Sequence, residues 1–382
     1  MHLSRKDLNR ITLSKHYLLS KSGEAIEVIS RICGLNAQVA SSPYLSLWNR
    51  VAEFHKDSLD RELYRTKRAL KSWFMRGTVH IVPSNEYPIY RNALKESMLR
   101  DWNRYLKKSG GPSPEDVVHL SEGIIKALEE GELTKREIEE RVKDLWGGYG
   151  EKERKVFLSR TIRGLSYQGL LCHTQPTGSW YHFRENRFAR TDRWLPDLAG
   201  ERVNESRAKK ELLLRYLKGY GPATIRDFAY WTGYRAYEAK EAFDLAKDEL
   251  AEAKVEDVSR QFWALKEDLK GFERGQSDEE LPPHFLPAFD PLLMGHREKS
   301  RLLNPTYQNK VFLPLADVAP TLLLDGMVTG IWSYRKGKDH LIMKISPFRR
   351  LKDQELKEVR IQAEALSAFM GFGPLNLKIE KL

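Results

Sequence analysis

The chain has 382 residues, of which 41% are hydrophobic and 31% charged, and its formal net charge at pH 7 is +11. This length is too great for one hydrophobic core, so several packing units are expected. The two cysteines, Cys33 and Cys172, are too few for a disulfide scaffold or a cysteine-rich zinc site, and a reducing cytoplasm is the expected compartment. No apolar run reaches the roughly 18 residues of a membrane span, and the polar N-terminal residues predict no secretory signal.

The positive charge is concentrated in two stretches. Residues 61–110 contain 12 Lys and Arg against 4 Asp and Glu, and residues 158–235 contain 14 against 7. Residues 111–157 have the opposite balance, 8 against 12. Positive blocks favour a polyanionic partner, because cations that neutralise phosphates release condensed counterions. A soluble protein that is merely basic has the same charge, so the charge suggests nucleic acid without establishing it.

The N-terminal part reads as helices followed by a hairpin. Apolar residues three and four positions apart predict helices over 7–20, 24–35 and 61–71. Residues 73–83 then have strand character, with Gly77 as the turn and Pro83 as the end. Helices followed by a β-hairpin are typical of a winged helix.

The same pattern returns twice. Helices over 114–128, from the N-cap Thr134 and over 155–168 precede strands at 169–174 and 180–183, with a turn at 175–179 between them. The aromatic residues of the second strand are expected to pack this wing. A third pass begins with helices over 207–217, from Thr224 and over 236–246.

A polar linker over 270–283 precedes a β-rich region. Strands are predicted over 321–324, 327–334 and 340–345, with a tight turn at Asp325-Gly326 and a helix over 353–369. The predicted fold class is α+β, with three tandem winged-helix units over 1–111, 112–200 and 201–280. The β-rich region with its closing helix occupies 281–382.

Common catalytic motifs are absent from the sequence. It contains no Gly-rich phosphate loop, GxGxxG, HExxH, CxxC or GxSxG, and its ten histidines lack metal-ligand spacing. No metal and no nucleotide cofactor are therefore predicted.

Residues 35–50 (LNAQVASSPYLSLWNR) place two carboxamides, Asn36 and Gln38, on either side of Ala37. This segment resembles the signature loop of the winged-helix DNA glycosylases of the AlkZ/YcaQ type, which remove alkylated bases and unhook interstrand crosslinks. Blocks at 73–82, 221–231, 286–297 and 320–326 are similar to further family blocks and follow in the family's order.

The resemblance implies three winged helices in a C-shaped body that grips duplex DNA, and a catalytic pair written Gln-apolar-Gln or Gln-apolar-Asp. Gln38 matches the second position of the AlkZ branch, whereas Asn36 replaces the usual glutamine. Asparagine is shorter by one carbon–carbon bond, about 1.5 Å. Misplacement of this size costs on the order of a hundredfold in rate.

Two carboxamides suit this chemistry. An N7- or N3-alkylated purine is a cationic leaving group, so the site must chiefly orient water and stabilise an oxocarbenium-like sugar. A carboxamide has both an acceptor and a donor for these tasks. The structural alternative is that Asn36 caps a helix end and Gln38 satisfies buried backbone groups.

Three further residues are candidates for catalytic support. Alternating strand spacing predicts that Arg76, Thr78 and His80 share one polar face beside the loop, with His80 as a possible proton acceptor. A solvated strand face is the alternative. Asp290 is the candidate catalytic carboxylate if the two loop carboxamides are insufficient, although a buried ion pair with Arg297 is favoured.

Basic side chains on the predicted helices and hairpins are candidates for phosphate contacts, and a solvated charged face is equally compatible with any one of them. The resemblance also favours a basic hairpin turn that enters a DNA groove. The candidate DNA-binding residues are Arg50, Arg91, Lys95, Arg100, Arg104, Lys209, Lys210, Arg226, Arg335, Lys336 and Lys338.

The resulting prediction is a monomeric DNA glycosylase without a cofactor. It would hydrolyse the N-glycosidic bond of N7- or N3-alkylated or crosslinked bases in duplex DNA, in the cytoplasm and, in a bacterium or archaeon, at the nucleoid. The alternative is a non-catalytic winged-helix DNA-binding protein, either a regulator or a lesion-shielding protein. A regulator would dimerise to read two half-sites.

Overall fold

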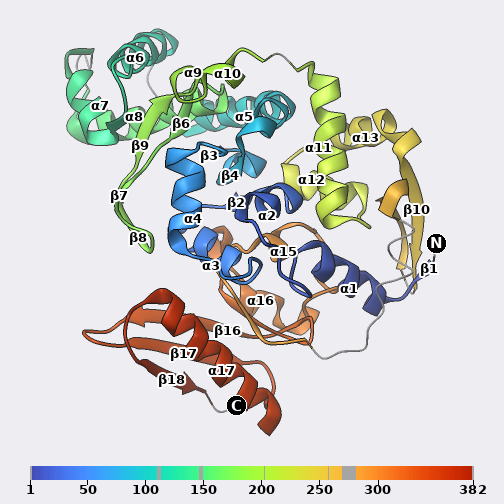
Figure 1. Cartoon of the computed structure of the whole chain (residues 1–382). Helices are drawn as coiled ribbons and strands as arrows, with labels where there is room; N and C mark the ends of the chain where they lie inside the picture. Colours follow the sequence, from blue (N-terminus) through green and yellow to red (C-terminus); the bar gives the residue numbers. More distant parts are fainter. Residues whose placement is uncertain are drawn as a thin grey trace. The chain divides into compact units, whose positions relative to one another are not determined.

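The computed structural model describes residues 2–109, 113–145, 149–201, 203–256, 258–268 and 281–380. These residues form helices and strands in an α+β arrangement, which confirms the predicted fold class (Figure 1). They divide into two compact units. Unit 1 consists of the chain up to His55, Arg215–Tyr230 and the chain from Lys247 onward, and unit 2 consists of Lys56–Leu214 and Trp231–Ala246. Most of the predicted linker over 270–283 lies outside the described residues.

Unit 2 is built around an antiparallel sheet in which five strands follow the order β4-β3-β6-β9-β5. Lys71 of β3 pairs with His173 of β6, so the strand predicted at 169–174 joins the sheet of the first predicted hairpin. The predicted pairing of 169–174 with 180–183 is wrong, because β6 pairs with β9 instead. A separate hairpin, β7-β8, extends from this sheet. The strands are β3 (Ala69–Trp73), β4 (Val79–Pro83), β5 (Leu133–Thr134), β6 (Leu171–His173), β7 (Thr177–Ser179), β8 (His182–Glu185) and β9 (Arg187–Arg190).

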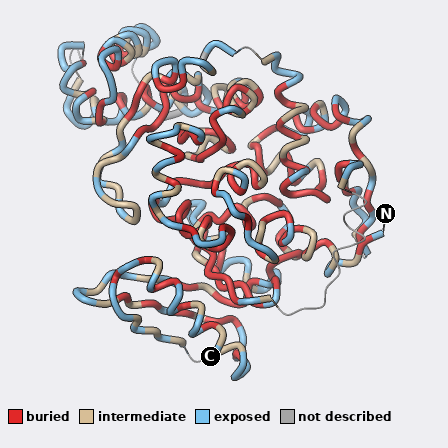
Figure 2. The backbone as a smooth tube through the Cα atoms, in the orientation of Figure 1, coloured by how far each residue is buried: buried red, intermediate tan, exposed pale blue. Residues whose placement is uncertain are grey.

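Helices cover this sheet and enclose an apolar core. Leu120, Ile138 and Leu158, each on a different helix, pack with Leu171 and Phe188 of the strands. Figure 2 shows the opposite faces of α6 and α7 exposed. The helices are α4 (Lys56–Asp60), α5 (Tyr87–Ser109), α6 (Pro114–Ala127), α7 (Lys135–Arg141), α8 (Glu151–Tyr167), α9 (Thr191–Trp194), α10 (Pro196–Ala199) and α13 (Ala236–Leu245). The chain passes between the units within α11 (Glu205–Tyr220) and α12 (Ile225–Thr232).

The predicted helix over 61–71 is wrong in its second half. Helix α4 continues as a π-helical turn only to Arg65, and β3 begins at Ala69. Residues 69–73 pair in register with residues 79–83, and this ladder outweighs their helical spacing. The predicted turn at 175–179 is also misplaced, because Thr177–Ser179 forms β7. Thr134, by contrast, is the N-cap of α7, as expected.

Unit 1 contains a five-stranded sheet in the order β12-β15-β16-β17-β18, antiparallel except for the parallel pair β17-β18. Unit 1 also contains the three-stranded sheet β1-β10-β11, the pair β13-β14 and the short strand β2. The strands are β1 (His2–Leu3), β2 (Leu35–Asn36), β10 (Leu250–Val255), β11 (Val258–Leu265), β12 (His284–Leu286), β13 (Phe312–Leu313), β14 (Asp317–Val318), β15 (Thr321–Leu324), β16 (Met327–Lys336), β17 (Leu341–Pro347) and β18 (Leu375–Ile379).

Helices from both ends of the chain pack in unit 1. Leu13 and Leu18, at and after α1, share a core with Leu286, Leu292 and Leu323. At the far end of the chain, α17 packs against β18 (Figure 1). The helices are α1 (Arg5–Lys15), α2 (Ala25–Arg31), α3 (Ser42–Trp48), α15 (Pro291–Met294), α16 (Gln308–Val311) and α17 (Asp353–Met370). No helix in the described part of the chain is long and apolar enough to cross a membrane.

The predicted Asp325-Gly326 hairpin turn is confirmed, and it is tied to α1. Asp325 and Gly326 have φ values of 42° and 77°. Asn9 of α1 donates from Nδ2 to the carbonyl oxygens of Gly326 and Arg301, both at 2.8 Å. A Cβ on Gly326 would lie 2.6 Å from Asn9 Oδ1, so the close approach requires glycine.

Gly326→Ala should therefore lower the free energy of unfolding by more than about 1 kcal/mol, since it adds a steric clash to an unfavourable φ. Urea denaturation of the full chain measures the change. Gly23→Ala is the matched control, because a Cβ there meets nothing within 4 Å. Equal losses in both variants would contradict the docking of the turn on α1.

Candidate active site

The loop that carries Asn36 and Gln38 begins where α2 is forced to end. Cys33 and Gly34 both have left-handed backbone conformations, with φ values of 55° and 97°. The Gly34 N–H donates to the carbonyl oxygen of Ile29 at 2.8 Å, which closes the last helical turn. The chain then enters the short strand β2 at Leu35.

The two carboxamides contact each other. Asn36, only 4% exposed, donates from Nδ2 to Gln38 Oε1 at 2.9 Å. Its Oδ1 accepts the backbone N–H of Gln38 at 3.0 Å. Gln38 itself is exposed, and no described residue accepts a hydrogen bond from its Nε2. The buried amide therefore fixes the exposed one, and the Nε2 donors of Gln38 bind no group of the described residues.

This geometry differs from the structural alternative considered for the pair. Asn36 does bind a backbone N–H, but that of Gln38 within the loop rather than that of a helix end. Gln38 is exposed, so it does not satisfy a buried backbone group.

A buried polar network fastens α3, the helix that follows the loop. Ser42 donates from Oγ to the carbonyl oxygen of Ala288 at 2.8 Å, and Ser46 donates to Asp290 Oδ2 at 3.1 Å. Arg50 donates from Nη2 to Asp290 Oδ1 at 2.6 Å and from Nη1 to Asp290 Oδ2 at 2.9 Å. Both ion-pair side chains are 0% exposed. Both Nη groups of Arg50 are hydrogen-bonded, while its buried Nε has no acceptor among the described residues. The ion pair holds α3 against a segment some 240 positions away.

The partner segment is shaped for this contact. Phe289 has a left-handed φ of 57°, which is costly for a residue with a Cβ and persists only where the surroundings enforce it. Asp290 then caps α15, since its Oδ1 accepts the Leu292 N–H at 3.0 Å. One carboxylate thus holds both α3 and the start of α15.

Two predictions for these residues need correction. Arg50, expected to contact DNA, is fully buried and cannot reach a phosphate in this structure. Asp290 is in a buried ion pair, as favoured, but with Arg50 instead of Arg297. Arg297 is exposed, and its backbone N–H donates to Asp227. Both oxygens of Asp290 are engaged in the core, which argues against a catalytic role.

The basic turn at 335–339 is connected to the candidate loop through Tyr334. This residue lies near the end of β16, and its Oη donates to Ser41 Oγ at 2.9 Å. Ser41 lies three positions after Gln38, directly before α3. The exposed cations Arg335 and Lys336 therefore follow a residue that touches the segment between the loop and α3.

In unit 2, the expected polar strand face is wrong. Arg76 lies in the 3₁₀ turn Met75–Gly77 with a φ of 57°, and β4 begins only at Val79. Its Nη1 donates to the carbonyl oxygen of Trp231 at 2.6 Å. His80 is buried, with Nδ1 2.9 Å from the Thr78 carbonyl oxygen. Burial, helped by the nearby Arg76 charge, lowers the pKa of His80 to about 3, so it is neutral at physiological pH.

The candidate DNA-binding cations divide into held and exposed groups. Lys209 is buried between Glu205 and Glu241, which corrects the expectation of a phosphate contact. Arg100 forms a bidentate pair with Glu238, and Arg91 donates to the carbonyl oxygen of Glu201. Lys95 and Lys210 are half-buried. The exposed members are Arg104, Arg226, Arg335, Lys336 and Lys338.

Ser42, Ser46 and Tyr334 complete the candidate site and were not singled out from the sequence. Ser42 and Ser46 lie inside the signature segment, so the resemblance did include them. Nothing in the local pattern around Tyr334 marks it, since its partner is 293 positions away. Among the described residues, no cluster of three His, Cys, Asp or Glu side chains could hold a metal ion.

Asp290→Asn should destabilise the chain by about 3–5 kcal/mol, because it leaves the Arg50 charge buried without a counterion. The double variant Arg50→Met/Asp290→Asn removes both charges and should recover part of this loss. Thermal unfolding of the full chain measures both. Asp244→Asn, at the exposed Lys240–Asp244 pair, is the control and should have little effect. An Asp290→Asn variant as stable as the wild type would contradict the role of the network.

The lowered pKa of His80 leads to a second prediction, on how the stability of the fold depends on pH. Its folded-state pKa of about 3 lies below the ordinary value of 6.5, so between these values the unfolded chain binds more protons. This contribution to stability is complete above pH 6.5 and is lost as pH falls toward 3. A His80→Gln variant should show a shallower loss of stability over this range in urea titrations at several pH values. Parallel curves for variant and wild type would show that His80 is not buried in its neutral form.

Comparison with known proteins agrees with this architecture. The family model described as DNA glycosylase AlkZ-like matches residues 29–369. The chain is 26% identical over 376 residues to an interstrand DNA cross-link repair glycosylase from Streptomyces sahachiroi, covering 93% of each chain. It is also similar to the solved structure of Streptomyces sahachiroi DNA glycosylase AlkZ, with a TM-score of 0.81, 24% identity and complete coverage of both chains. The chain belongs to the AlkZ-like family of DNA glycosylases.

Proposed function

We propose that this DNA glycosylase hydrolyses the N-glycosidic bond of N7- or N3-alkylated purines in duplex DNA at the Asn36–Gln38 loop. The exposed Gln38 carboxamide, held by the buried Asn36 carboxamide, carries the proposal. The Streptomyces sahachiroi relative is named for interstrand crosslink repair, so crosslinked bases are included in the proposed substrate class.

The chemistry demands little of the protein beyond orientation and charge stabilisation. Alkylation at N7 or N3 leaves the purine cationic, so the bond to the sugar breaks without strong acid catalysis. Gln38 Oε1 accepts one hydrogen bond from Asn36 and has a second lone pair with which to orient an attacking water. The two N–H donors of Gln38 can bind a phosphate or sugar oxygen beside the developing oxocarbenium ion.

Asn36 has a positioning role in this scheme. Its side chain is buried and both ends of its carboxamide bind Gln38, one to the backbone and one to the side chain. The shorter side chain makes an interaction with the backbone two residues ahead that is typical of asparagine. Asparagine at position 36, in place of the family glutamine, thus preorganises Gln38. Of the two carboxamides, only that of Gln38 then contacts the substrate.

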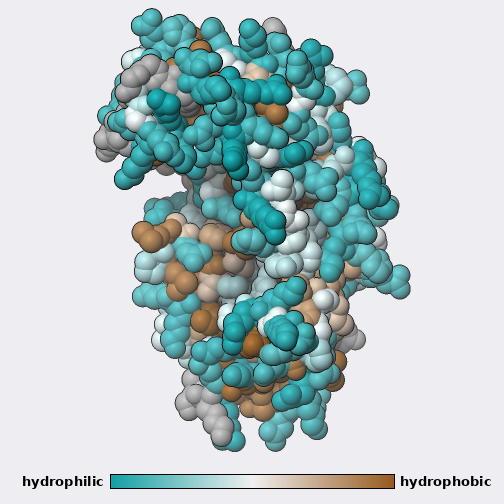
Figure 3. Space-filling model, turned by 90° about the vertical axis from the view of Figure 1, so that its left-hand side faces the viewer, coloured by the Kyte–Doolittle hydropathy of each residue, from teal (hydrophilic) through white to brown (hydrophobic). Residues whose placement is uncertain are grey.

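DNA binding is assigned to the exposed cations of each unit. In unit 1, Arg335, Lys336 and Lys338 follow Tyr334, which contacts Ser41 near the loop. On the face drawn in Figure 3, hydrophilic side chains predominate and hydrophobic ones gather in a few places. The enzyme is proposed to act as a monomer and in the cytoplasm, with the nucleoid as its location in a bacterial or archaeal cell.

The test is release of base from a duplex with a single N7-methylguanine, scored by strand cleavage in alkali. The wild type should release the base, and Gln38→Ala should reduce release at least a hundredfold, since the only exposed carboxamide of the pair is lost. Gln308→Ala, at an exposed glutamine of unit 1, is the control and should be fully active.

Asn36→Gln separates the two roles. If Asn36 preorganises Gln38, this variant should be slower than the wild type while binding duplex equally well. A faster Asn36→Gln variant would instead show that asparagine impairs a two-glutamine site. Duplex binding without base release by the wild type would overturn the proposal for this lesion and favour a non-catalytic, lesion-shielding role.

A further inference from the structure

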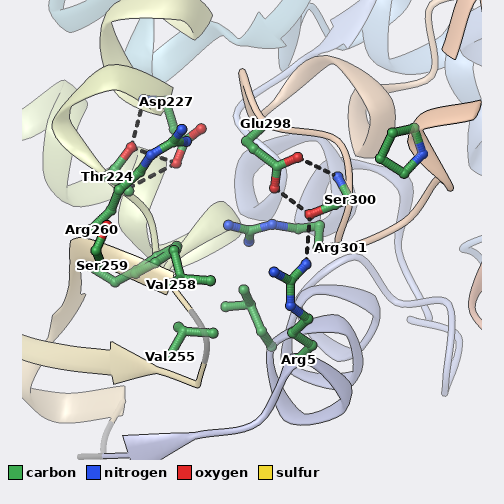
Figure 4. Close-up of a pocket in the computed structure, with 13 residues that line it drawn as sticks. Arg5, Thr224, Asp227, Val255, Val258, Ser259, Arg260, Glu298, Ser300 and Arg301 are labelled. Atoms are coloured by element: carbon green, nitrogen blue, oxygen red, sulfur yellow. Dashed lines mark hydrogen bonds between the residues drawn. The ribbon is translucent and has the colours of Figure 1, made fainter.

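Unit 1 contains a cavity of about 430 Å³ that has no residue in common with the Asn36–Gln38 loop or its contacts. It lies between the start of α1, the start of α12, the strands β10 and β11, and residues 298–305 (Figure 4). Leu8, Val255 and Val258 line part of it with apolar surface. Three arginines, Arg5, Arg260 and Arg301, line the rest together with hydroxyl and carboxylate groups.

Arg301 is buried in this cavity without an ion-pair partner among the described residues. It is only 7% exposed, and its Nη1 donates to Thr12 Oγ1 and to the Pro222 carbonyl oxygen, both at a long 3.3 Å. No described residue accepts from its Nε or Nη2. Burying a charge in this way is unfavourable unless an opposite charge compensates it. Arg50, equally buried, has a bidentate carboxylate partner.

The two carboxylates that line the cavity accept hydrogen bonds from groups other than Arg301. Asp227 Oδ2 accepts from the backbone N–H and the hydroxyl of Thr224, at 2.9 and 2.8 Å, and its Oδ1 accepts the Arg297 N–H at 2.8 Å. Glu298 accepts from the N–H and hydroxyl of Ser300. Asp227 attracts Arg301 electrostatically but makes no hydrogen bond to it. The start of α12 is therefore already capped by Asp227, and the free donors belong to arginine side chains.

The side chains in Figure 4 show where these donors point. The Arg301 guanidinium extends toward Thr224 and Val258, and the Arg5 guanidinium is directed toward the same region. Arg5 donates from Nη1 to Ser300 Oγ at 3.2 Å, which holds it beside the cavity. Arg5 and Arg260 are both exposed, so they form the accessible side, with Arg301 at the buried end.

We propose that this cavity is a phosphate-binding site, with Arg301 as the buried anchor and Arg5 and Arg260 as the outer contacts. The planar guanidinium fork matches two phosphate oxygens, and a partly apolar surrounding strengthens such charge-assisted hydrogen bonds. The phosphate supplies the hydrogen-bond acceptors that Arg301 Nε and Nη2 lack among the described residues. The site is independent of base release at the Asn36–Gln38 loop, and its ligand is either a small phosphate compound or a phosphate of the DNA backbone.

Isothermal titration of the full chain with inorganic phosphate, at ionic strength held constant with chloride, tests the site directly. The wild type should show saturable binding at one site. Arg5→Gln/Arg260→Gln should weaken it at least tenfold, and Arg301→Gln should abolish it. Arg350→Gln removes an exposed arginine of unit 1 that lies outside the cavity and should bind as the wild type does. Because Arg5 and Arg260 are exposed, their double variant keeps the test valid if Arg301→Gln fails to fold.

A second titration identifies the source of the phosphate. Affinity for an undamaged duplex is measured against salt concentration for the wild type and for Arg5→Gln/Arg260→Gln. A slope of log affinity against log salt reduced by about two in the double variant would support a backbone phosphate, since each lost contact removes about one released counterion. Phosphate binding with an unchanged slope would support a small phosphate compound. Neither phosphate binding nor a change of slope, or equal phosphate binding by the double variant and the wild type, would overturn the proposal.

Discussion

The ion pair between Arg50 and Asp290 is the interaction on which the geometry of the candidate site depends. Both side chains are fully buried, and the pair joins the helix after the candidate loop to a segment that also begins α15. A pair of this kind contributes little net stability compared with apolar residues of the same size. Removing only one of its two charges, however, strongly destabilises the folded state. Its effect is therefore to select one arrangement of the two segments, in which Ser42 and Ser46 also find their partners.

A loop held in this way can orient a neutral catalytic group. Carboxamides do not ionise, so neither burial nor a neighbouring ion changes their charge. Their value in catalysis therefore depends on the orientation of their hydrogen-bond donors and acceptors. Asn36 supplies that direction, since its two hydrogen bonds fix both the backbone and the side chain of Gln38. Nearby, Tyr334 binds Ser41, so the strand that leads to the basic turn also meets the segment after the loop.

The sequence predicts helix caps and tight turns well, because these features depend on residues only a few positions apart. Thr134 caps its helix and Asp325-Gly326 forms its turn through interactions a few residues long. The prediction of helix for residues 69–71 is wrong, because their pairing with β4 outweighs the helical spacing of apolar residues in this segment. The resemblance identifies the two carboxamides of the loop. It does not show that Arg50 is buried, because that depends on Asp290, about 240 positions away in the sequence. Arg76 lies outside the strand because its left-handed φ places it in the turn, which strand alternation does not reveal.

The division of unit 1 into three stretches of chain has a consequence for its synthesis. Unit 2 is complete once Ala246 has been made, whereas unit 1 still lacks everything from Lys247 onward. At about 5–20 residues per second, the last stretch takes a ribosome roughly 7–27 s to add. During this interval Leu13 and Leu18 lack their later core partners, and Arg50 lacks its counterion. Until the last stretch is made, the N-terminal segment of unit 1 thus exposes apolar side chains that the finished core covers, and such exposure favours aggregation or chaperone binding.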